Sequence, residues 1–125
     1  MTTIKAGGRT YTLYFTLAAM DEIEDALGEP LTFEENQLTE IMTDRRKAMK
    51  VFTAFANQGE IAQGREGDLT VKSISRTIRP GEIMKLENAI VAEIVAGARM
   101  ETETDDDAEV DVVLEELKKK ETKAE

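Results

Sequence analysis

The chain has 125 residues, an ordinary size for one domain, and carries 26 acidic against 16 basic residues, a formal net charge of −10. It contains no Cys and no His, which excludes disulfides, thiolate chemistry, cysteine metal sites and histidine bases. Its cations suggest no phosphate-binding groove, and no apolar run approaches the roughly 20 residues of a membrane span, so we expect neither nucleic acid nor a membrane as a partner.

The first predicted element is a β-hairpin. Two β-prone runs, 2–6 and 9–15, flank a pair of glycines that can adopt the positive φ angles of a tight turn. In the second run Tyr11, Leu13 and Phe15 alternate with Thr and Tyr, which indicates a half-buried strand. An isolated hairpin is marginal in water, so its apolar face requires a helix or another chain.

A helix over residues 17–27 follows the hairpin without a linker. Thr16 is its predicted N-cap, and Gly28 can take the left-handed conformation that ends a helix. Four apolar residues at helical spacing form its predicted core-facing stripe: Leu17, Met20, Ile23 and Leu27.

A second helical region is predicted from about residue 35 to residue 58. Its capping pair Thr43-Asp44 predicts a break or a kink. Gly59, Gly64 and Gly67 are expected to loosen the chain, although Ile61-Ala62 could prolong the helix.

Thr70 can cap a short helix, but the segment is rich in β-branched residues, so a strand remains an alternative. Pro80 ends it just before the last helix of the body, predicted from Gly81 to about Met100. The apolar arc of that helix is wider than one core-facing stripe requires. Either it is a central helix packed on two sides, or one edge is an interface with another subunit or partner.

The composition changes near residue 100. Residues 101–125 hold eleven acids and four lysines, whereas residues 1–100 hold fifteen acids and twelve bases. We therefore predict a compact domain over 1–100 and an acidic, partly disordered tail over 101–125. Within the tail, a short amphipathic helix is predicted near 109–120. It is expected either to dock on its own body or to bind a partner.

No catalytic or metal-binding pattern emerges. The tail acids Asp105, Asp107, Glu109, Asp111 and Glu116 have the spacing of an EF-hand loop, but Val110 stands where that loop needs glycine. There is no P-loop, and no histidine to activate a serine. We expect a protein that is not an enzyme and has no metal or cofactor.

These elements predict an α+β fold, mainly α, in which an N-terminal hairpin packs on a small bundle of about four helices. The order of elements resembles the small tail assembly chaperones of long-tailed phages, prophages and gene-transfer agents. The strand YTLYFTL leads directly into a helix in which Leu17, Ile23, Glu24 and Gly28 match the family pattern. The middle helix and its small-residue end match over 52–59.

The resemblance implies a non-catalytic chaperone that binds the tape measure protein and helps recruit tail tube subunits. It would act in the cytoplasm of the bacterial host and be absent from the mature virion. The alternatives are a minor structural tail or head–tail connector protein, and an acidic inhibitor or regulatory adaptor. Pairing with a second copy is open. The candidate partner-binding residues are apolar: Phe52, Phe55, Met84, Val91, Val95, Val110, Val113, Leu114 and Leu117. For Phe52, Phe55 and the residues of the last helix, ordinary core packing is the favoured alternative.

Overall fold

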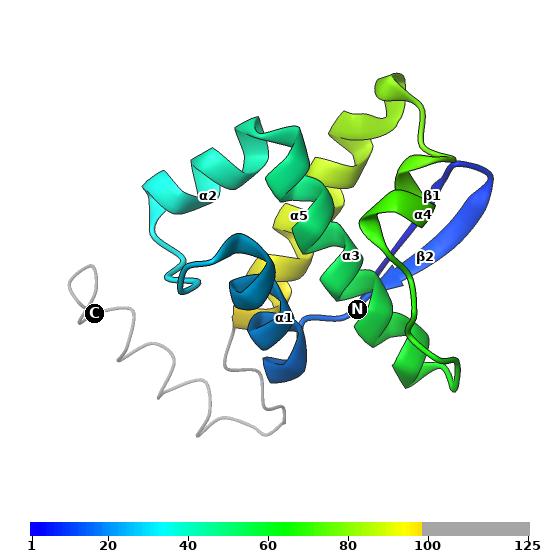
Figure 1. The fold of residues 1–125 in the computed structure, drawn as a ribbon, viewed down its shortest axis with the longest axis horizontal. Helices are drawn as coiled ribbons and strands as arrows, with labels where there is room; N and C mark the ends of the chain where they lie inside the picture. The colour runs from blue at the N-terminus through cyan, green and yellow to red at the C-terminus, as the bar shows by residue number, and fades with distance from the viewer. Residues whose placement is uncertain (99–125) are drawn as a thin grey trace, which may run out of the picture.

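The computed structural model describes residues 1–98, and these form a two-stranded hairpin followed by helices (Figure 1). The fold is therefore α+β and mainly α, as the sequence predicts. Within residues 1–98, no helix has the length and apolar character needed to cross a membrane. In chain order the elements are β1 (Thr2–Ala6), β2 (Arg9–Leu13), α1 (Leu17–Leu27), α2 (Glu35–Thr43), α3 (Arg45–Ala62), α4 (Val71–Ser75), the 3₁₀ helix η1 (Pro80–Glu82) and α5 (Ile83–Ala98).

The hairpin is antiparallel, with Thr2 opposite Leu13 at its open end. Its second strand ends at Leu13, two residues earlier than predicted, because β1 offers no partner beyond Thr2. The next backbone N–H, that of Tyr14, instead donates to the carbonyl oxygen of Phe55 at 3.1 Å. The hairpin is thus attached to α3 at the point where the chain turns into α1.

Helix α1 has both predicted caps. The Thr16 hydroxyl accepts a hydrogen bond from the backbone N–H of Ala19 at 3.1 Å. Gly28 is left-handed, with φ 76°, and its N–H donates to the carbonyl of Glu24. The predicted apolar stripe is wrong at Leu17, which is 80% exposed, because α1 turns Ala19 and Ile23 toward the core.

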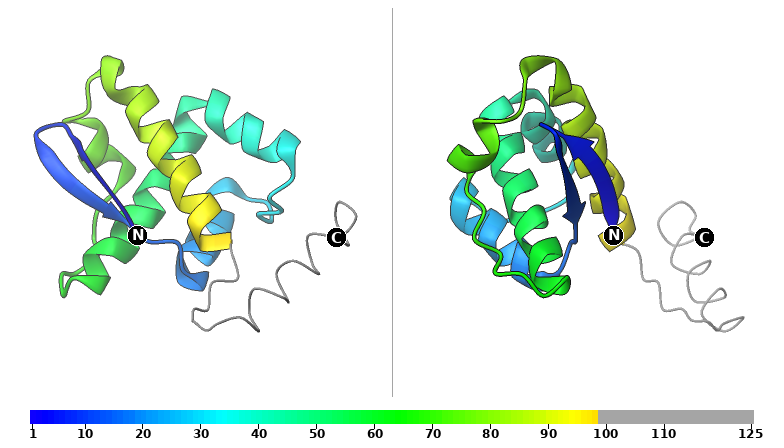
Figure 2. Two further views of the ribbon diagram at one scale, coloured as in Figure 1. Left: turned by 180° about the vertical axis from the view of Figure 1, so that it is seen from behind. Right: turned by 90° about the vertical axis from the view of Figure 1, so that its right-hand side faces the viewer.

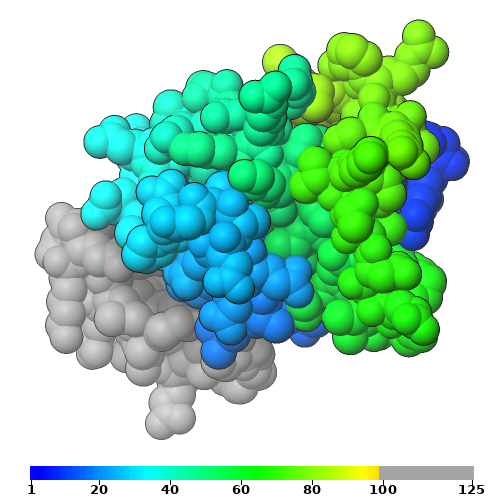
Figure 3. All heavy atoms as spheres, in the orientation of Figure 1, coloured from blue at the N-terminus to red at the C-terminus, as the bar shows by residue number. Residues whose placement is uncertain are grey.

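Helix α3 is the centre of the molecule. It contacts α1, α2, α4, α5 and β2, and every residue from 51 to 60 is buried. Figure 2 shows from two further sides how α5 and the hairpin lie against it. Figure 3 shows one face of the molecule, with the α1 and α2 regions toward one end and the α4 region toward the other. The predicted break before α3 is confirmed, since the Asp44 carboxylate accepts from the N–H groups of Arg46 and Lys47.

Gly59 lies inside α3, which continues to Ala62, so the alternative of a prolonged helix is the one adopted. A Cβ at this position would lie 1.8 Å from the carbonyl oxygen of Thr12. Glycine therefore allows the backbone of β2 to approach α3 more closely than any other residue would.

The chain between α3 and α5 is held by side chains of its neighbours. Asn57 bonds both backbone groups of Leu69, accepting at 2.7 Å and donating at 2.9 Å. Residues 71–75 are helical, capped by reciprocal bonds between Thr70 and Ser73, so the strand alternative is not adopted. A 3₁₀ turn begins at Pro80, which is why α5 starts two residues later than predicted.

Glu82 connects η1 to the hairpin. Its carboxylate accepts from the backbone N–H groups of Arg79 at 2.9 Å and of Gly7 at 3.0 Å, and these bonds hold the pKa of Glu82 below its ordinary value of 4.5. A carboxyl whose pKa is lower in the folded state than in the unfolded state stabilises the folded protein. This stabilisation is complete at pH values above the unfolded-state pKa, and it is lost as the pH falls through the folded-state pKa.

When the pH is lowered from about 7 to about 3, we therefore expect the free energy of unfolding to fall less in the Glu82→Gln variant than in the unmodified chain. Urea unfolding at both pH values measures this difference. Glu87→Gln, which removes a carboxylate further along α5, is the matched control. Equal acid sensitivity of the Glu82→Gln variant and the unmodified chain would contradict the assigned role of Glu82.

Candidate functional site

Two of the predicted partner-binding residues are core residues. Phe52 and Phe55 are each 0% exposed on α3, so their prediction as contact residues is wrong. The ring of Phe52 packs edge-on against Tyr11 with centroids 5.2 Å apart, and that of Phe55 lies 5.0 Å from Phe15. The physical reason is that α3 is covered on all sides over residues 51–60, so that both rings fill space between α3 and the hairpin.

Three other predicted residues are exposed on α5. Met84 is 70% exposed, Val91 45% and Val95 54%. With the exposed residues Asn88 and Ala92 they form the α5 outer face. Met84, Asn88, Val91 and Val95 follow each other at intervals of four, three and four residues, the spacing of a coiled-coil seam. Seen from behind the view of Figure 1, this helix lies in front, and no element within residues 1–98 crosses it (Figure 2).

The opposite side of α5 packs against α3 and the hairpin. Its buried apolar residues are Leu86, Ala89, Ile90 and Ile94. At the hairpin end, Gly97 brings α5 close to Phe15, because a Cβ there would lie 2.5 Å from the phenyl ring. These contacts fix which side of the helix remains exposed.

A buried carboxylate also fixes the orientation of α5. Glu93 is 2% exposed and accepts from the Thr2 hydroxyl at 2.7 Å and from the backbone N–H of Phe15 at 3.0 Å. The N-terminal ammonium of Met1 lies 4.0 Å from it. Both carboxylate oxygens thus have partners, and these interactions offset the free-energy cost of burying the charge. Sequence reasoning missed Glu93, because its partners are up to 92 residues away in the chain.

A second buried acid, Glu60, holds the end of α3. Its carboxylate lies 3.2 Å from Arg9 and 3.0 Å from the Nε of Arg65. Glu93 and Glu60 each have a structural set of partners, and within residues 1–98 no group of three or more acidic side chains could hold a metal ion.

The four remaining predicted residues, Val110, Val113, Leu114 and Leu117, lie outside the described residues, as do the predicted amphipathic helix and the calcium-like spacing of the tail acids. Of the five predicted residues within 1–98, the structure brings Met84, Val91 and Val95 together on one exposed face.

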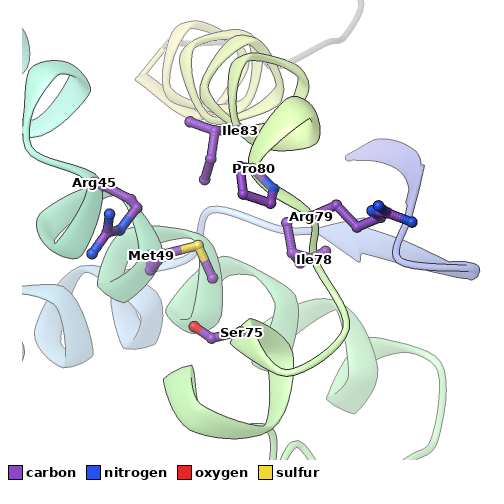
Figure 4. Close-up of a pocket in the computed structure, with 7 residues that line it drawn as sticks. All are labelled: Arg45, Met49, Ser75, Ile78, Arg79, Pro80 and Ile83. Carbon is purple, nitrogen blue, oxygen red and sulfur yellow. The ribbon is translucent and has the colours of Figure 1, made fainter.

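A cavity of about 230 Å³ lies at the other end of α5 from Gly97. Figure 4 shows apolar side chains in its middle, with Arg45 of α3 on one side and Arg79 on the other, where the Arg79 guanidinium extends outward from the cavity. The sequence did not single out this site, because its two arginines belong to segments far apart in the chain. The residues that line the cavity are Arg45, Met49, Ser75, Ile78, Arg79, Pro80 and Ile83.

No protein family, curated protein or solved structure matches the chain.

Proposed function

We propose that this chain is a non-catalytic tail assembly chaperone of a long-tailed phage or prophage. It binds the tape measure protein in the cytoplasm of the bacterial host, helps recruit tail tube subunits and is left out of the mature virion. The proposal joins the resemblance in the order of elements to one structural observation, the α5 outer face. A face of this kind suits a protein that works by binding.

The dimensions of the α5 outer face suit a helical client. The distance along the helix from Met84 to Val95 is about 16 Å, or three turns. A row spaced at four, three and four residues accepts the apolar stripe of a second helix by knobs-into-holes packing. The tape measure protein of the resembled family is long and largely helical, so it offers such stripes.

The chemistry of the face also suits a chaperone. Met84 has an unbranched, polarizable side chain that adapts to differently shaped partners, and Asn88 gives the row one polar position. The net charge of −10 keeps a protein with exposed apolar surface soluble.

Co-expression with the tape measure protein of the same gene cluster tests the function. We expect that protein to be soluble in the presence of the full chain and to aggregate in its absence. Unchanged solubility without the chain would contradict the proposal. Recovery of the chain from purified virions would contradict it as well, and would favour a minor structural tail protein.

A further inference from the structure

We propose that the cavity between α3, η1 and α5 binds the distal part of the acidic C-terminal segment of the same chain, residues 107–117. The arginines on either side receive the acids of this segment, and the apolar middle of the cavity receives its aliphatic side chains. This inference does not depend on the proposed function, because it concerns an intramolecular contact at a different surface from the α5 outer face.

The rim of the cavity is basic although the protein as a whole is acidic. Within residues 1–98, neither Arg45 nor Arg79 has a carboxylate within 4.0 Å, whereas Arg9, Lys47 and Arg65 do. The rim arginines are therefore free to pair with carboxylates from outside the body.

The acids closest in sequence to the rim have other partners. Asp44 accepts from backbone N–H groups at the start of α3, and Glu82 accepts from those of Gly7 and Arg79. Besides these hydrogen bonds, Glu82 also feels the positive charge of Arg79, which helps to lower its pKa, so the charge of Arg79 is shared with Glu82. Arg45 has no carboxylate within 4.0 Å in residues 1–98.

The interior of the cavity is apolar, with Met49, Ile78 and Ile83 among its lining side chains. A water molecule takes up about 30 Å³ of liquid, so a space of about 230 Å³ admits one or two aliphatic side chains. A ligand that combines carboxylates with aliphatic side chains would satisfy both the rim and the interior.

The C-terminal segment has this combined chemistry. Residues 101–111 hold seven acids and no base. Aliphatic residues follow at helical spacing: Val110, Val113, Leu114 and Leu117. Opposite charges and matching apolar groups thus occur in one chain, and tethering raises the effective concentration of the segment to about the millimolar range.

The segment is long enough to reach the cavity. Ile83 and Ala98 are at opposite ends of α5, which puts them about 22 Å apart along the helix. The twelve residues from Ala98 to Val110 span up to about 40 Å when extended. The connection therefore exceeds the length of α5 and leaves slack to pass around the helix.

Paramagnetic broadening in the full chain tests the contact. The chain has no cysteine, so Ala108→Cys carries a single nitroxide label without altering any acid. We expect loss of amide signal intensity at residues 45–49 and 75–83, and much less at residues 21–25 of α1. Unbroadened cavity amides would overturn the proposal. So would broadening seen only between differently labelled molecules, which would assign the cavity to a second copy.

Two variants of the labelled chain identify the chemistry. Arg45→Glu with Arg79→Glu should abolish the broadening, whereas Arg46→Glu, a change of the same kind outside the cavity lining, should preserve most of it. Leu114→Ser with Leu117→Ser should also abolish it, and leaves every residue from 45 to 83 unchanged in sequence. Broadening that survives the paired leucine substitutions would contradict apolar docking, even if the paired arginine variant fails to fold.

Discussion

Replacing Phe55 with alanine should lower the free energy of unfolding by about 3–5 kcal/mol, the usual cost of removing a buried phenyl ring. Phe55 is fully buried in α3 and packs against Phe15 near the joint between the hairpin and α1. Single domains are stable by only about 5–15 kcal/mol, so this one change should remove a large share of the total.

Urea unfolding measures the effect as a shift of the transition midpoint at an unchanged slope. Val95→Ala is the matched control, since it shortens a half-exposed side chain and should change stability by no more than about 0.5 kcal/mol. Unchanged stability of Phe55→Ala together with lost client binding would return Phe55 to the binding surface, where the sequence placed it.

Replacing Gly59 with alanine should destabilise the protein by about 3 kcal/mol or more, at or above the upper end of ordinary overpacking. The added Cβ would meet the Thr12 carbonyl oxygen at 1.8 Å, and a backbone atom cannot rotate away as a side chain can. In an open helix the same change would stabilise by about 1 kcal/mol, so the contact with β2 decides the sign.

Gly81→Ala is the control for Gly59→Ala. A Cβ at Gly81 has no neighbour within 4 Å, and its φ is not positive, so alanine should be neutral or slightly stabilising. Thermal unfolding of the two variants provides the comparison. A Gly59→Ala variant as stable as Gly81→Ala would show that β2 does not lie against α3 at this point.

Local signals in the sequence predicted the elements well. Thr16 and Gly28 delimit α1, and Asp44 separates α2 from α3, because caps act within a few residues of the helix end. The hairpin could be predicted equally well, since a pair of glycines between two alternating runs of residues is a local sequence pattern.

Packing around α3 could not be predicted in the same way. Helical periodicity finds one apolar face, but α3 also buries Asn57, Gln58 and Glu60, each satisfied by partners elsewhere in the chain. A helix covered on all sides leaves no face for a partner, which is why Phe52 and Phe55 were misassigned.

Of the two candidate sites, one could be predicted from the sequence and the other could not. The excess apolar width of the last helix was visible as a pattern, and the α5 outer face is where that excess lies. The cavity was not visible, because Arg45 and Arg79 are 34 positions apart and the charge of the body looked nearly balanced. Only the fold brings these arginines to one rim.

The central proposal, that the α5 outer face binds a client helix, is tested most directly by Val95→Asp in the full chain. Ile61→Asp is the matched control, because Ile61 is 50% exposed near the end of α3 and Val95 is 54% exposed near the end of α5. We predict that Val95→Asp weakens binding of the tape measure protein about tenfold or more while Ile61→Asp leaves it unchanged. Equal affinity of the two variants would contradict the proposal.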